Sequence, residues 1–216
     1  MIRTDFSIST FKGGYDENFQ YVLSCLRTDT HIAVDAALPL DRIESYLNGP
    51  LKAILITHTH GDHIAFIHEY LDAFPNMLMV IHKRSAGRIK ALNVHFTNDN
   101  EKIQIGELLI HTLHTPGHFP DSSCYVLENI VFTGDTLFVG RTGRTVGEGS
   151  DISMLYHSVY KKLLILPQES VIYPGHDYGD SPTISISKNI KISPLLQAEN
   201  ERDFIKRMAA YEASRN

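Results

Sequence analysis

The chain has 216 residues, of which 43% are hydrophobic and 21% charged, so it is long enough to bury a full core. Its net charge of −5 comes from scattered acidic and basic residues, which argues against a nucleic-acid-binding surface. Two cysteines, a start unlike a signal peptide and no apolar run of about 18 residues indicate a cytoplasmic protein without a disulfide framework or membrane span.

Short apolar runs alternate with amphipathic segments through the first half of the chain. A short run bounded by turn residues predicts a buried strand, and apolar residues three or four positions apart predict a helix. Pro75 and the Gly-Pro pair at 49–50 end two of these helices. In chain order we expect strands at 19–26 and 31–38, a helix at 40–49, a strand at 51–57, a helix at 62–74, a strand at 77–82 and a weakly amphipathic helix near 84–92.

The second half is richer in strands, with turns expected at Gly106 and Asn129. We expect strands within 102–115, at 122–128 and at 129–135, then a helix at 152–167, a strand at 170–177 and a short helical tail over about 194–216. No repeat or long linker divides the chain. The pattern therefore predicts one mixed α/β (α+β) domain over residues 1–216, with helices packed outside the sheets.

Three histidines and an aspartate are crowded into the sequence HTHGDH, directly after an apolar run. A buried turn of this composition needs a partner for its polar groups, and a metal ion provides one. Further metal-capable residues follow three later apolar runs, each beside a glycine that lets the backbone turn. The candidate metal ligands are His58, His60, Asp62, His63, His118, Asp135 and His176. We read the isolated histidines as structural, namely His31, His68, His82, His95, His111, His114 and His157.

These motifs resemble those of the metallo-β-lactamase superfamily, in which THTHGDH, TPGH, TGDTLF and YPGHDYG occur in this order. The resemblance covers residues 20–200, and within the superfamily it looks most like glyoxalase II (hydroxyacylglutathione hydrolase) and the persulfide dioxygenases. It implies a four-layer αββα sandwich with the site at one edge of two facing sheets. It further implies one metal held by His58, His60 and His118, a second held by Asp62, His63 and His176, and Asp135 as a bridge between them.

Imidazole and carboxylate ligands make zinc the first expectation for two divalent metal ions, and iron or manganese also fit. Such ions lower the pKa of a bound water to about 7, which supplies a metal-bound hydroxide at neutral pH. Apart from the catalytic candidate Asp62, the motifs contain no general acid, which favours a leaving group that departs as a thiolate. We therefore predict a metal-dependent thioester hydrolase. Superfamily β-lactamases often have a cysteine where Asp135 stands, which disfavours lactamase activity.

The same ligands support a second class of enzyme. His58, His118 and Asp135 form a two-histidine, one-carboxylate set for a single iron, which the resemblance assigns to dioxygenases acting on glutathione persulfide. Those enzymes usually have an aspartate where this chain has Val146. A metal-binding scaffold without activity is a third alternative, against which the complete ligand set argues.

Two residues are expected to contact substrate, on the resemblance alone. Arg144 aligns with a basic residue that contacts a glutathione carboxylate, although it also fits a solvated loop charge, and Tyr178 aligns with a tyrosine of the same pocket. The substrate is therefore expected to be a small glutathione thioester, with no nucleic-acid or membrane partner. Glyoxalase II has a longer C-terminal helical domain than the tail at 194–216, so a different thioester or ester stays open. The pattern indicates no oligomeric state.

Overall fold

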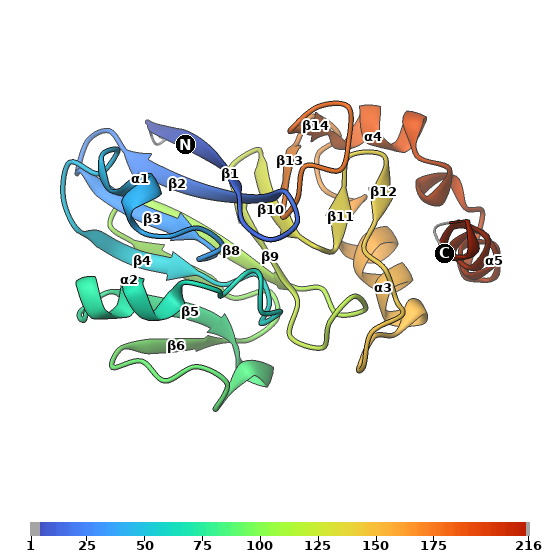
Figure 1. The fold of residues 1–216 in the computed structure, drawn as a ribbon. Coiled ribbons are helices and arrows are strands. Elements are labelled where there is room, and N and C mark those ends of the chain that lie inside the picture. The colour runs from blue at the N-terminus through green and yellow to red at the C-terminus, as the bar shows by residue number, and fades with distance from the viewer. Residues whose placement is uncertain (1–4, 215–216) are drawn as a thin grey trace.

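The computed structural model describes residues 5–214, and two large β-sheets face each other at its centre (Figure 1). The first sheet contains, in spatial order, β1 (Phe6–Gly13), β2 (Asn18–Cys25), β3 (Thr30–Val34), β4 (Leu51–Leu55), β5 (Leu78–His82) and β6 (Val94–Thr97). The second contains β14 (Ile184–Ser185), β13 (Val171–Pro174), β10 (Ile130–Gly134), β9 (Ser123–Leu127), β8 (Leu108–His114) and β7 (Lys102–Ile105). A separate hairpin joins β11 (Leu137–Phe138) to β12 (Arg141–Thr142).

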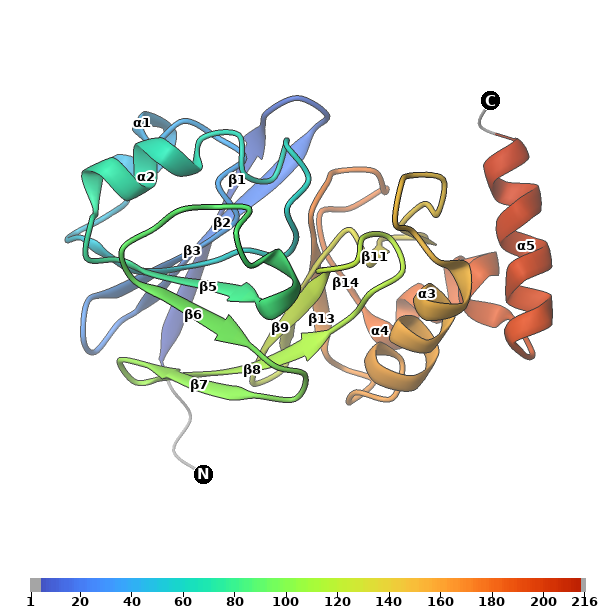
Figure 2. The same cartoon turned by 90° about the horizontal axis from the view of Figure 1, so that it is seen from below.

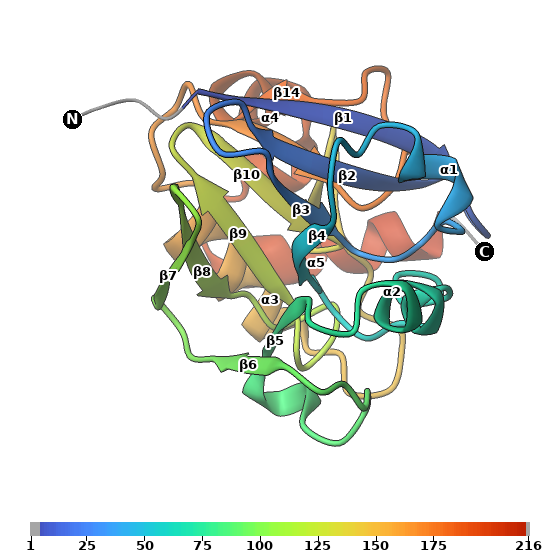
Figure 3. The same cartoon turned by 90° about the vertical axis from the view of Figure 1, so that its left-hand side faces the viewer.

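Helices cover the outer faces of both sheets (Figures 1 and 2). The first sheet carries α1 (Asp41–Glu44) and α2 (Ile67–Ala73), and the second carries α3 (Ile152–Ser158), α4 (Ile186–Ile192) and α5 (Glu201–Ala213). Figure 3 looks from the side of α1 and α2 across the first sheet, with α5 behind. Shorter helical turns are the 3₁₀ segments η1 (Lys83–Ser85) and η3 (Pro194–Gln197) and the π-helical segment η2 (Val159–Leu163). The expected αββα sandwich is therefore confirmed.

The strands divide their side chains between two apolar layers because successive residues point to opposite faces. In β3, Ile32 and Val34 enter the core between the sheets, whereas Ala33 faces the helices. Leu55 and Ile54 of β4 divide in the same way. Strands buried on both faces read as continuous apolar runs, which is why these elements were predictable from the sequence.

The strand directions bring several C-terminal ends to one edge of the sandwich. Strand β10 is parallel to β13, and β9 is antiparallel to both β8 and β10, so β8, β10 and β13 run the same way. In the first sheet, β3 and β4 are parallel. The Ser123 N–H donates to the Thr57 carbonyl at 2.8 Å and joins the two sheets at this edge. Loops that follow these strands therefore meet.

Some helical expectations were wrong. The helix expected at 62–74 begins only at Ile67, because the preceding residues form turns tied to Ala36 by two backbone hydrogen bonds of 2.8 and 3.0 Å. The helix expected near 84–92 is only the short η1, which is followed by Gly87 with φ of +85°. By contrast, the helix expected at 152–167 is present, as α3 continued by the π-helical η2, and it ends at Leu163.

Several elements had no counterpart in the expectations, above all β1, β6 and α4. Strand β1 (FSISTFKG) alternates polar with apolar residues at the edge of its sheet, a pattern typical of a half-buried strand that the expectations did not use. The strand expected at 31–38 ends at Val34, and the expected tail contains η3 and α5, with residues 215–216 outside the described part. None of the helices within 5–214 has the length and apolar character needed to cross a membrane. The single-domain expectation stays a prediction.

Candidate metal centre

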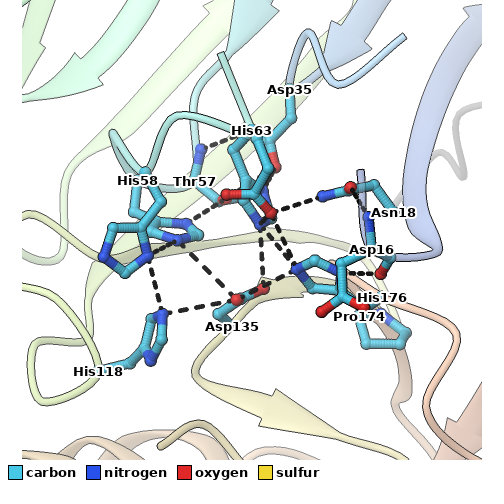
Figure 4. Close-up of polar contacts among 12 residues, drawn as sticks. Asp16, Asn18, Asp35, Thr57, His58, His63, His118, Asp135, Pro174 and His176 are labelled. Carbon is cyan, nitrogen blue, oxygen red and sulfur yellow. Dashed lines mark hydrogen bonds and ion pairs between the residues drawn. The ribbon is translucent and has the colours of Figure 1, made fainter. Parts of the chain in front are cut away.

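All seven predicted ligand residues lie together at the shared sheet edge. Figure 4 labels His58, His63, His118, Asp135 and His176 among them. The loop after β4 carries four of the seven, and the loops after β8, β10 and β13 carry one each. This set is called the candidate metal centre below, and its members are His58, His60, Asp62, His63, His118, Asp135 and His176. Strand ends are rigid, so they hold side chains within the tolerance that metal coordination requires.

The first group consists of His58, His60 and His118. The Nδ1 atom of His60 lies 2.9 Å from His58 Nε2 and 3.0 Å from His118 Nε2. One nitrogen from each ring therefore converges on the same small volume, and these atoms lie within 4.8 Å of one another. Three converging imidazoles can hold one divalent cation.

The second group consists of Asp62, His63 and His176. His176 Nε2 lies 3.2 Å from His63 Nε2 and 3.3 Å from Asp62 Oδ2. Asp135 lies between the groups, with Oδ1 at 3.2 Å from His63 Nε2 and Oδ2 at 3.5 Å from His118 Nε2. Its position therefore suits a bridging carboxylate.

Outward hydrogen bonds set the ring orientation of three histidines. The Nδ1 atoms of His118 and His176 donate to the Arg144 and Asp16 carbonyls at 2.9 and 2.6 Å. His63 Nδ1 lies 2.8 Å from the Asp35 carboxylate. A proton on Nδ1 leaves the Nε2 lone pair facing inward, which is the form of histidine that binds a metal. The donor set therefore fits two divalent cations.

Sequence reasoning missed two residues that support the centre. Asp35 directly follows β3, has φ of +60° and accepts hydrogen bonds from Thr57 N (2.7 Å), Thr57 Oγ1 (2.8 Å) and His63. Asn18 donates from Nδ2 to Asp62 Oδ2 at 2.9 Å. Asp35 could have been suspected, because an acidic residue directly after an apolar strand is unusual, but Asn18 has no comparable signal.

A glycine permits the close packing at the centre. A Cβ atom at Gly175 would lie 2.4 Å from Asp135 Oδ1 and 2.7 Å from His63 Cε1. Only glycine lets the backbone before His176 approach these side chains. The YPGH motif is thus explained by packing as well as by its histidine.

The carboxylates make the centre attractive to positive charge. Burial lowers the pKa of His176, but its contacts with Asp135 and Asp62 outweigh burial and raise that pKa to about 10. Burial is likewise outweighed at His63, where Asp135 and Asp35 raise the pKa well above its usual value. Burial opposes ionisation of Asp135, yet the neighbouring histidines lower its pKa well below the usual range. Divalent cations fit this charge balance and would displace the protons.

A cavity of about 140 Å³ opens onto His118 and Asp135, and both predicted substrate residues line it. The Nε atom of Arg144 is buried there without a hydrogen-bond partner. The Tyr178 ring stacks on His176 at 4.7 Å between centroids. Arg141, which sequence reasoning missed, lies 4.7 Å from the Tyr178 ring centre. The cavity therefore presents two guanidinium groups beside the ligands.

A larger open groove of about 470 Å³ lies between Phe6 and Tyr173. Its lining holds no histidine and only one carboxylate, Asp5, so its size alone does not indicate a site. The smaller cavity is the better candidate for a substrate site, because candidate metal ligands and arginines line it.

Comparisons with known proteins agree with this geometry. The Metallo-beta-lactamase superfamily domain matches residues 25–176. The probable hydroxyacylglutathione hydrolase glo2 of Schizosaccharomyces pombe is 35% identical over 179 residues, which are 78% of this chain and 67% of that protein. Human persulfide dioxygenase ETHE1 is 29% identical over 196 residues, 88% of this chain and 75% of that protein. The crystal structure of ETHE1 from Myxococcus xanthus superposes with a TM-score of 0.83 at 26% identity, covering 95% of this chain and 91% of that one. The chain belongs to the metallo-β-lactamase superfamily.

Proposed function

We propose that this protein is a metal-dependent hydrolase that cleaves a glutathione thioester with two divalent cations. The observation that carries the proposal is the complete second group. Asp62 contacts His176 and is held by Asn18, so the second position is as well organised as the first. Zinc is the first choice of metal because histidine and carboxylate donors suit it, and since no thiolate is present to enforce zinc, iron or manganese suit the same donors.

When bound, the cations supply an acidified water and polarise the scissile carbonyl. Side chains that line the cavity bind and orient the substrate. Arg144 and Arg141 give the cavity positive charge, which suits the carboxylates of a glutathione moiety. Tyr178 keeps its place through its hydroxyl, which donates to Asp16, and through its stacking on His176.

Asp62 is the catalytic candidate as well as a proposed ligand. Burial raises the pKa of Asp62, but contacts with His176, His63 and Asn18 outweigh burial and lower it. A carboxylate that stays ionised has no proton to donate to a leaving group. That behaviour suits a thiolate leaving group, whose conjugate acid has a pKa of roughly 8 to 9 and which departs without protonation. A thioester therefore fits this centre better than an amide.

A persulfide dioxygenase is the second candidate, favoured by the likeness to ETHE1 over most of the chain. His118 and His58 lie 3.5 and 4.0 Å from Asp135, so these three residues could hold a single iron. Against it, the exposed Val146 stands where the dioxygenases usually have an aspartate.

We also place the protein in the cytoplasm and propose that it acts as one domain, from the sequence expectations alone.

One experiment separates the two activities. Zinc-loaded and iron-loaded protein are assayed for cleavage of S-lactoylglutathione under argon and in air, and for oxygen uptake with glutathione persulfide. The hydrolase proposal expects thioester cleavage at similar rates with and without oxygen. Oxygen uptake that requires iron, without thioester cleavage, would instead establish the dioxygenase. Absence of both activities would refute the glutathione substrate.

A further inference from the structure

The ligand loop after β4 alternates threonine with histidine. The rings of His58 and His60 face the candidate metal centre, whereas the threonine hydroxyls reach two separate buried carboxylates. Thr57 Oγ1 donates to Asp35 at 2.8 Å, and Thr59 Oγ1 donates to Asp121 at 2.6 Å. Each carboxylate therefore holds one turn of the loop from the side opposite the metal ligands.

The surroundings of Asp121 consist of hydrogen-bond donors and not of cations. Its side chain accepts from Thr59 Oγ1, from Thr59 N at 3.3 Å and from Ser85 Oγ at 2.7 Å. The residue is only 2% exposed, and within residues 5–214 no lysine, arginine or histidine nitrogen forms an ion pair with it. A buried carboxylate is costly unless such donors satisfy it, so its placement against Thr59 calls for an explanation.

The segment from His118 to Ser123 contacts the ligand loop at three successive points. The Phe119 ring packs on the His60 ring with centroids 4.2 Å apart. Asp121 holds Thr59, and the Ser123 N–H donates to the Thr57 carbonyl at 2.8 Å. This segment also carries the third histidine of the first group. Asp121 thus joins the two loops whose spacing defines that group.

We propose that Asp121 is a positioning residue for the first group and not for the second. It fixes Thr59, and thereby the distance of His58 and His60 from His118. The second group has other supports, since Asn18 holds Asp62, Asp35 holds His63 and the Asp16 carbonyl holds His176. This inference rests on one part of the proposed function, namely that the candidate metal centre binds two cations. It does not depend on the thioesterase activity.

The test measures zinc affinity of each site, without substrate, by chelator competition on full-length protein. The single-site variants His118→Ala and His176→Ala assign the two binding steps. Asp121→Ala is expected to weaken the first site by about 10- to 100-fold, the range for lost support of a metal ligand. The second site should stay within about twofold, the scatter of uncoupled positions.

Matched variants separate positioning from general destabilisation. Thr59→Val keeps the branched shape and removes the hydroxyl, so it should weaken the first site similarly, and the double variant with Asp121→Ala should add little. Asp121→Asn keeps one acceptor oxygen and should recover part of the affinity. Ser85→Ala removes the other partner of Asp121 without touching the ligand loop and should leave both sites intact.

Equal losses at both sites in folded Thr59→Val, or normal first-site affinity in that variant, would overturn the inference. If Asp121→Ala does not fold, Thr59→Val and Asp121→Asn still decide the matter. Loss of the predicted thioesterase activity alone would leave this result standing, because the readout is metal affinity.

Discussion

The second group of the candidate metal centre and a separate stacked pair of histidines have opposite electrostatics. Burial lowers the pKa of His58 and His60 in the first group, whereas in the second group Asp135 and Asp62 raise the pKa of His176 to about 10. In the stacked pair, at the ends of β5 and β8, the rings of His82 and His114 stack with centroids 3.7 Å apart and planes 7° from parallel. There, burial and the neighbouring His114 lower the pKa of His82 to about 4.

The hydrogen-bond partners explain the difference. At the centre, three ring Nδ1 atoms donate outward and carboxylates face the inner nitrogens. In the stacked pair, His82 Nδ1 accepts from the Arg84 N–H at 3.3 Å, and His114 Nε2 donates to the Pro120 carbonyl at 2.9 Å. The rings face each other flat, so their lone pairs do not converge. Carboxylates and ring orientation, and not the number of histidines, therefore distinguish a metal-binding cluster.

The largest effect is expected when a histidine of the candidate metal centre is replaced, in comparison with a histidine elsewhere. His58→Ala should lower the hydrolysis rate by at least about 10²-fold, because losing a ligand costs more than losing the support of one. His157→Ala on α3, whose side chain is 59% exposed, should stay within about twofold. Steady-state kinetics and metal analysis check both. A His58→Ala protein with full rate and two metals would remove the basis of the comparison.

The second contrast concerns support by a carboxylate. Asp35→Asn should weaken zinc binding at the second group by about 10- to 100-fold. An amide has one acceptor oxygen, so it cannot accept the Thr57 N–H at one atom and both the Thr57 hydroxyl and His63 at the other, as the carboxylate does. The matched control is Asp99→Asn, beside the stacked pair, where Asp99 accepts from the His114 N–H at 2.9 Å. Its zinc affinity should be unchanged in the same chelator titration, and a loss there would show that the effect is not specific to the centre.

A smaller effect is expected at Asp62, which is the more exposed carboxylate of the centre. Asp62→Asn keeps the size of the side chain and removes its charge, so the second cation should weaken by about tenfold before the first does. Metal stoichiometry during dialysis against a weak chelator should fall from two to one. Retention of two metals with an unchanged rate would mean that Asp62 is not a ligand.

The smallest effect concerns acid stability of the stacked pair. The folded-state pKa of His82 lies below its unfolded value, so the unfolded chain binds the proton first and stability falls as pH drops from about 6.5 towards 4. His114, Asp121, Lys83 and Arg84 are the charged groups that face His82. His82→Phe keeps a ring and removes the proton site, so urea unfolding of the metal-free protein should show a shallower loss over this range. An unchanged slope would contradict the assignment.

The sequence alone determined the fold class and the seven residues of the candidate centre, because both depend on local patterns. Apolar runs buried on both faces identify β2 to β5, and ligands placed directly after such runs follow the strand ends into the centre. The helix expected near 84–92 had a weak local pattern that tertiary contacts overrode. The edge strand β1 has an alternating pattern typical of a half-buried strand, which the expectations missed.

Only the tertiary structure decided which residues support the ligands. Asp35 and His63 are 28 residues apart, Asn18 and Asp62 are 44 apart, and Thr59 and Asp121 are 62 apart. No spacing rule within one element connects such pairs. Asp35 meets His63, and Asn18 meets Asp62, only when strands of the first sheet come together, and Thr59 meets Asp121 only when the two sheets pack. The same holds for the stacked pair, since the ring nitrogens of His82 and His114 gain their roles from Arg84 and Pro120 after folding. The chemistry of a ligand is local, but its tautomer and charge are set by partners that the fold brings near.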